Sequence, residues 1–215
     1  MRSVIKSKGR LAVMLSKLEG LKEPKVSVEQ YPTESEICAF VLWQAYYLND
    51  IKCKVIADLG CGNGILGIGA LILGAKKVYF IDIDKNVLKI AKRNVNKIKS
   101  ECWVEGEAEF VCENVVCDKL DIMCDVVVQN PPFGVKVRHQ DRNFLVSAFK
   151  LAPVVYSFHK SVCKLFVRNF SKRYGFKVSH EWDFLFPIKA MYKFHKRRIK
   201  RIKVSCLRLI KELNI

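Results

Sequence analysis

The stretch that decides the fold is CKVIADLGCGNGILGIGALILG, residues 53–74. The apolar run over 53–58 predicts a buried strand, and residues 65–73 predict a helix that Gly74 ends. The turn between them is rich in glycine, so its backbone can bend sharply and approach a ligand without a Cβ in the way. Because ligands of open α/β sheets bind at the carboxyl ends of strands, this turn is a candidate binding site.

Strands and helices alternate after this unit. The pattern predicts strands over 77–82, 108–112, 125–129 and 153–157, with helices over 84–98, 141–150 and 160–174. Two long strands, 176–186 and 199–210, follow without a helix between them. Regular alternation means parallel strands joined by crossover helices, so we predict an α/β fold. Its single doubly wound, mostly parallel sheet should have seven strands and an antiparallel edge.

The N-terminal part is predicted to be helical. Residues 3–20 form a first helix, and Thr33 with Glu36 is expected to make a capping box at the start of a second. We expect one domain overall, with a helical extension over 1–50 packed on a core over 51–215. No apolar run reaches the ~18 residues of a membrane span, and the first residues lack the apolar centre of a signal peptide. We therefore expect a cytoplasmic protein.

The positive charge is concentrated near the ends of the chain. The formal net charge is +17; residues 159–215 hold sixteen Lys and Arg against three acids, whereas residues 26–158 hold fifteen against sixteen. Such segregation favours binding of a phosphate backbone. For His159 and His195, stacking on nucleobases and a plain surface position are both open. The 9 cysteines match no zinc spacing, so we expect buried thiols and no metal site.

Carboxylates follow the first two strands of the predicted sheet. Asp58 lies at the edge of the glycine turn, where it suits the ammonium group of adenosylmethionine and would repel a pyrophosphate. Residues 62–67 also fit the GxGxxG dinucleotide pattern, which is a weak signal alone. Asp82 can accept both ribose hydroxyls of a bound nucleoside. We favour it over Asp84, which is the predicted cap of the next helix.

Two further strand ends carry candidate side chains. Asn114 is placed to bond the cofactor's adenine, with Val115 on the ring, although a plain turn asparagine is a strong alternative. Asn130-Pro131-Pro132-Phe133 follows the run over 125–129, and its prolines remove two N–H donors and fix φ. Its carbonyls and the Asn130 amide oxygen can then hold a planar amine, with Phe133 stacked on the group that carries it. This suits methyl transfer to an adenine or a carboxamide; the alternative is a rigid turn.

The chain resembles the class I adenosylmethionine-dependent methyltransferases that methylate amino groups. Segments 29–33, 58–62, 80–84, 130–134, 156–160 and 192–196 are similar to the family that N6-methylates one adenosine of small-subunit ribosomal RNA in eukaryotes and has archaeal members. The resemblance implies a Rossmann-like fold, S-adenosyl-L-methionine as cofactor and ribosomal RNA as substrate. Eukaryotic members work with a small zinc-containing activator subunit.

The same resemblance assigns roles by position. It implies Asn130 to Phe133 as the catalytic loop. Asn63 and Asn114 depart from the eukaryotic pattern, which has Cys and Asp there. The Asn114 amide can still accept from the adenine amine through its oxygen, so cofactor binding is expected to persist. Cofactor contacts are implied for Gln30, Thr33, Gly60, Asn63, Ile65, Asp82, Asn114 and Val115.

Two other functions remain open from the sequence. A protein glutamine methyltransferase uses the same kind of loop on a carboxamide, and a non-catalytic RNA-binding module would need only the basic surface. The intact Asp58, Asp82 and Asn130 argue against the second.

Overall fold

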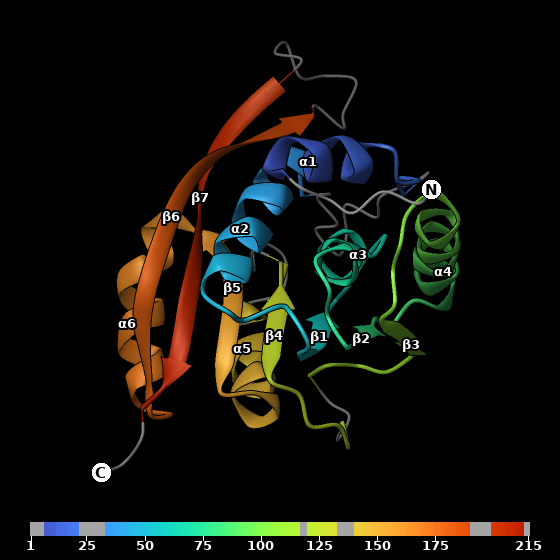
Figure 1. Ribbon diagram of the computed structural model, residues 1–215. Coiled ribbons are helices and arrows are strands. Elements are labelled where there is room, and N and C mark those ends of the chain that lie inside the picture. The colour runs from blue at the N-terminus through green and yellow to red at the C-terminus, as the bar shows by residue number, and fades with distance from the viewer. Residues whose placement is uncertain (1–6, 22–32, 117–119, 133–139, 190–198, 213–215) are drawn as a thin grey trace.

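The structure is a computed structural model that describes residues 7–21, 33–116, 120–132, 140–189 and 199–212 (Figure 1). Seven strands form one sheet in the order β3-β2-β1-β4-β5-β7-β6. The first five strands along the chain pair in parallel, and β7 lies antiparallel between β5 and β6. The predicted fold class is confirmed. The strands are β1 Val55–Leu59, β2 Lys77–Ile81, β3 Glu107–Val111, β4 Val126–Gln129, β5 Val154–Lys160, β6 Phe176–Lys189 and β7 Ile199–Lys211.

Helices cover both faces of the sheet. One apolar core lies between the sheet and four helices, α1 to α4, and a second lies under α5 and α6. None of the helices in the described ranges combines the length and apolarity needed to cross a membrane. The helices are α1 Lys8–Ser16, α2 Ser35–Tyr47, α3 Ile65–Ile72, α4 Lys85–Glu101, α5 Gln140–Leu151 and α6 Lys164–Lys172, the last preceded by the short 3-10 helix η2 Ser161–Cys163.

The N-terminal helices pack on the sheet through apolar side chains. Leu11 and Leu15 of α1 are buried in the same core as α2 and α3. The predicted cap at Thr33 is wrong, because α2 begins at Ser35 after an extended Glu34 that makes no side-chain cap bond. Thr33 bonds Asn130 instead, so a tertiary contact has replaced the local one. The division into a 1–50 extension and a 51–215 core stays a prediction.

A buried ion pair ties the end of α2 to the sheet. The Asp50 carboxylate accepts from Arg208 Nε at 2.7 Å and from the Tyr156 hydroxyl at 2.6 Å. Burial and this carboxylate raise the pKa of the Tyr156 hydroxyl, which therefore stays protonated as a donor. Because Tyr156 lies on β5 and Arg208 on β7, the contact fixes α2 over both strands.

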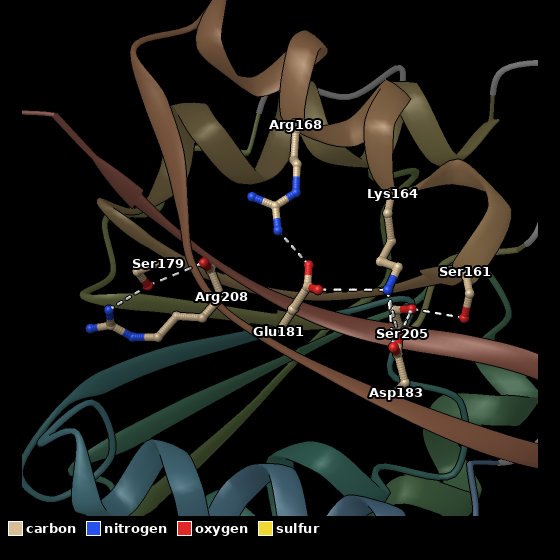
Figure 2. Close-up of polar contacts among 8 residues, drawn as sticks. All are labelled: Ser161, Lys164, Arg168, Ser179, Glu181, Asp183, Ser205 and Arg208. Atoms are coloured by element: carbon tan, nitrogen blue, oxygen red, sulfur yellow. Dashed lines mark hydrogen bonds and ion pairs between the residues drawn. The ribbon is translucent and has the colours of Figure 1, made fainter.

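Ion pairs also join α6 to the edge of the sheet (Figure 2). Lys164 Nζ lies 3.0 Å from Asp183 Oδ2, and Arg168 Nη2 lies 2.5 Å from Glu181 Oε2. Partly exposed pairs of this kind contribute little to stability, ~1 kcal/mol or less each. Their consequence is electrostatic: two cations of the basic C-terminal region are matched by acids of β6.

Strand β5 runs to Lys160, beyond its predicted end at residue 157. It is held on both sides, and its last residues pair with β7, His159 opposite Ser205. Side chains alternate along a strand, so Ser157 and His159 share the face covered by α5 and α6, and His159 is buried. Both the stacking and the surface hypotheses are therefore wrong for His159. His195 lies outside the described residues.

Gly67 allows α3 to lie close to β2. A Cβ at this position would come 2.5 Å from Phe80 Cε1 and 2.9 Å from Val78 Cγ1. Since a stiff ring in a packed core cannot move far, we expect Gly67→Ala to cost about 1–3 kcal/mol in the free energy of unfolding, measured in urea.

A matched change is available in α1. In the described part of the chain, no heavy atom lies within 4 Å of a Cβ placed on Gly9. Gly9→Ala should therefore stabilise the protein by up to about 1 kcal/mol through helix propensity alone. Equal effects of the two substitutions would mean that the spacing of α3 and β2 is not limiting.

Candidate active site

The carboxyl ends of three parallel strands meet at one edge of the sheet. β1 lies between β2 and β4, with Asp58 in register with Phe80 and Val128. The strand order reverses between β1 and β4, and the helices that follow these strands lie on opposite faces. Such a switch point leaves a crevice outside the strand ends, where ligands of doubly wound sheets bind.

The turn after β1 requires glycine. Gly60, Gly62 and Gly64 have φ of 65°, 56° and 84°, in the left-handed region that side chains disfavour. A Cβ on Gly60 would also lie 3.1 Å from the Phe144 ring of α5. The Cys61 N–H donates to the Ile81 carbonyl at 2.9 Å. The turn is therefore held against the end of β2, and the contribution of Phe144 had no signal in the sequence.

Asp82 joins the ends of β1 and β2. Its Oδ2 accepts from the Gly62 N–H and its Oδ1 from the Asp84 N–H, both at 3.0 Å. Burial raises the pKa of this carboxyl, while the backbone donors lower it. A carboxylate has about four acceptor positions, so the backbone N–H groups of Gly62, Asp84 and Ile83 leave at least one free to accept from a hydroxyl. Asp84 caps α4 by accepting from the Asn86 N–H at 2.9 Å, as predicted.

Asp58 is almost fully buried at the end of β1, and its Oδ2 accepts from the Gly67 N–H at 2.8 Å. Burial raises the pKa of this carboxyl to about 8; the Gly67 N–H lowers it and the nearby Asp82 charge raises it. The free protein thus holds much of Asp58 neutral near pH 7. A cation bound beside it would draw the group into its carboxylate form.

Asn130 directly follows β4. Its Nδ2 donates to Thr33 Oγ1 at 2.8 Å. Its Oδ1 is buried and has no hydrogen-bond partner among the described residues. Pro131 is buried and Pro132 is half-buried. A buried acceptor without a donor costs free energy, so this oxygen is a candidate acceptor for a hydrogen bond from a ligand. Phe133 and Gln30 lie outside the described residues.

The other predicted cofactor residues are engaged in the protein framework. Asn63 Nδ2 donates to the Glu19 carbonyl at 3.2 Å, and the Asn63 carbonyl accepts from Asn94 Nδ2 at 3.0 Å. Asn114 Oδ1 accepts from the Val116 N–H at 3.0 Å, which is the turn arrangement raised as the alternative. Val115 and Ile65 are buried. The cofactor roles of these residues stay predictions.

A buried polar chain runs beside Asn130 and was not foreseen. Gln129 Nε2 donates to Ser157 Oγ at 2.9 Å, and Ser157 Oγ lies 2.7 Å from His159 Nε2. Burial lowers the pKa of His159 to about 4, so the ring is neutral near pH 7. Only the alternation of side chains along a longer β5 would have indicated this chain, which links the ends of β4 and β5.

Comparisons with known proteins agree with this geometry. The family model for ribosomal protein L11 methyltransferase (PrmA) matches residues 30–131. The rRNA N6-adenosine methyltransferase METTL5 of Danio rerio is 34% identical over 206 residues, which cover 90% of this chain and 94% of that protein. Mettl5 of Drosophila melanogaster is 31% identical over 212 residues, 91% of this chain and 92% of that protein.

Solved structures give the same picture. The crystal structure of a proposed RNA methyltransferase from Pyrococcus horikoshii superposes with a TM-score of 0.86 at 38% identity, and covers 97% of this chain and 100% of that one.

The raised pKa of Asp58 predicts a pH dependence of stability. The folded-state pKa of about 8 lies above the ordinary 3.8, so the stability that the neutral carboxyl contributes is complete below about pH 4 and is lost as the pH rises through 8. Asp58→Asn removes this loss. Without cofactor, the difference in urea midpoint between Asp58→Asn and the unchanged protein should grow from pH 5 to pH 8.5, roughly the window between the two pKa values.

Comparing the two proteins at each pH removes the contribution of other titrating groups, His159 included. Parallel curves across that range would show that burial does not hold Asp58 neutral.

Proposed function

We propose a mode of action for this chain from the premise that it belongs to the adenosylmethionine-dependent rRNA N6-adenosine methyltransferases. S-Adenosyl-L-methionine is its cofactor, and it methylates N6 of adenosine in RNA. We further propose that the target adenosine lies in small-subunit ribosomal RNA, as the resemblance implies. The observation that carries the mechanism is the buried Oδ1 of Asn130, which has no hydrogen-bond partner among the described residues.

The strand ends fit the cofactor in this proposal. Asp58 would hold the ammonium group, and Asp82, which keeps an acceptor position free, would accept from the ribose hydroxyls. The turn at Gly60 and Gly62 has no Cβ to keep the cofactor from the backbone. Asn114 and Val115 would lie at the adenine. When bound, the cofactor supplies a methyl group already activated on a sulfonium.

The residues after β4 would hold the acceptor. The target adenosine leaves its stack and enters the crevice. Asn130 Oδ1 and the Pro131 carbonyl accept the two N6 hydrogens, which directs the nitrogen lone pair towards the methyl group, and Phe133 stacks on the base. Transfer is in-line without a covalent enzyme intermediate, so the protein contributes orientation and fixed dipoles. The methylated amine then loses its extra proton to solvent.

RNA would approach over α1 and the free ends of β6 and β7. Figure 1 shows α1 beside these strand ends, on the side to which β1 and β4 point. Lys8 and Arg10 of α1 and Arg201 and Lys203 of β7 are exposed there. Lys164 and Arg168 of α6 are less suited to bind RNA, since both are paired with acids of β6. A basic surface beside the crevice would position the phosphates next to the target base.

The protein methyltransferase alternative is not favoured. Three relatives that match nearly the whole chain are rRNA N6-adenosine methyltransferases, whereas the match to the L11 methyltransferase model stops at residue 131 and leaves out the basic C-terminal region.

Two finer points remain part of the proposal. A small zinc-containing activator subunit is known for eukaryotic members of the family, and we propose a cytoplasmic enzyme that gains stability from such a partner. Co-purification of the tagged chain from its own cells, followed by zinc analysis of the complex, tests this.

Asn130→Ala should lower turnover about 10²–10³-fold, the usual cost of losing one preorganised hydrogen-bonding group. The measurement is incubation with small-subunit RNA and cofactor, digestion to nucleosides, and quantification of N6-methyladenosine by mass spectrometry. Cofactor affinity, measured by calorimetry, should change less than about twofold, because the amide faces the acceptor.

Asn86→Ala, at an exposed position of α4, serves as the control and should leave turnover unchanged. Loss of cofactor binding together with turnover would make Asn130 a structural residue. Label found in ribosomal proteins but not in RNA would revive the glutamine alternative.

Charge reversal at the start of β7 tests the RNA surface. Arg201→Glu with Lys203→Glu should weaken RNA binding and reduce the slope of log K against log salt by about two, one for each phosphate that the protein no longer neutralises. Lys89→Glu with Lys92→Glu on α4 makes the same charge change at exposed positions away from the crevice. If both double substitutions give the same slope of log K against log salt, the RNA does not bind at the start of β7.

A further inference from the structure

We propose that Thr33 is a positioning residue that orients the Asn130 amide for catalysis. The inference rests on the proposed function of Asn130 and gives Thr33 a role in place of the cofactor contact that the family resemblance implied. It starts from a property of the asparagine side chain. The two ends of the amide are nearly equal in size but opposite in hydrogen bonding, so packing alone cannot choose between its two orientations.

In the structure, Thr33 engages the nitrogen end of the amide. Asn130 Nδ2 donates to Thr33 Oγ1 at 2.8 Å, and this contact joins residues 97 positions apart in the chain. With the nitrogen engaged, the oxygen is directed away from Thr33, and it is the buried atom without a partner among the described residues. The amide therefore presents an acceptor, which is the group that an exocyclic amine requires.

The Thr33 hydroxyl is itself held in place. Thr33 is buried, and its hydroxyl lies near enough to the fully buried Cys38 thiol of α2 to lower the pKa of that thiol, which burial raises. A hydroxyl has one hydrogen to give and two lone pairs, so it can donate to the sulfur while it accepts from the Asn130 amide. The buried contact of Asp50 with Arg208 fixes the far end of α2 to the sheet. The anchor for the catalytic amide is thus built on a secured element.

Removal of the hydroxyl would free the amide to turn. The reversed amide would direct its NH2 group at the amine of the target base, so donor would face donor. Thr33→Val keeps the shape and loses the hydroxyl, and we expect turnover to fall roughly tenfold, the effect of one net hydrogen bond. Thr33→Ser keeps the hydroxyl and should retain most of the activity.

Three readouts separate positioning from the other roles. Cofactor affinity should stay within about twofold of the unchanged protein in both variants, since the hydroxyl acts through Asn130. Adding Thr33→Val to Asn130→Ala should cause no further loss of turnover, because residues that act through one contact are not additive. In NMR spectra, the Asn130 side-chain NH2 signals should shift and exchange faster with solvent in Thr33→Val and not in Thr33→Ser.

The inference is overturned if Thr33→Val loses cofactor affinity in step with turnover, or if Thr33→Ser is as poor as Thr33→Val. It is also overturned if the two substitutions reduce turnover independently. Failure of the underlying function looks different, because the unchanged protein would then form no N6-methyladenosine in RNA. If Thr33→Val proves unstable, the NMR comparison of Thr33→Ser with the unchanged protein still decides, since altered NH2 signals with the hydroxyl retained contradict the proposed contact.

Discussion

The hydrogen bond from the Gly62 N–H to the Asp82 carboxylate holds the site together. It joins the turn after β1 to the end of β2, and the turn can make it only because glycine adopts its left-handed backbone conformation. The same turn starts α3, whose Gly67 N–H reaches back to Asp58. Two carboxylates are thereby held at one sheet edge, where burial raises the pKa of both.

Buried polar groups divide into two kinds in this protein. Most, such as the Asp50 carboxylate with Arg208 and Tyr156, have their partners within the fold and serve to fix helices on the sheet. Gln129 Oε1, Asn130 Oδ1 and Ser171 Oγ are buried and have none among the described residues. Folding tolerates such a group only where another requirement outweighs its cost. For Asn130 Oδ1, the requirement that we propose is an acceptor ready for the amine of the target adenosine.

Charge is also distributed unevenly between two parts of the chain. The central part of the chain, which holds the candidate cofactor site, is nearly neutral, whereas the C-terminal part carries a large excess of Lys and Arg. Ion pairs between α6 and β6 neutralise part of that positive charge (Figure 2). Exposed cations remain on α1 and at the start of β7, on the side of the strand ends. The arrangement separates the attraction of a polyanion from the recognition of a small cationic cofactor.

The sequence by itself determined the alternation of strands and helices, the glycine turn, the capping role of Asp84 and the place of Asn130 after a strand. Each of these features depends on residues only a few positions apart in the chain, and local sequence patterns indicate such interactions. Tertiary structure alone decided that Thr33 bonds Asn130 and not its own helix, that Phe144 packs against Gly60, and that His159 is buried in a longer β5. Those outcomes depend on which distant segments the sheet brings side by side. No periodicity along the chain encodes a contact between residues 97 positions apart.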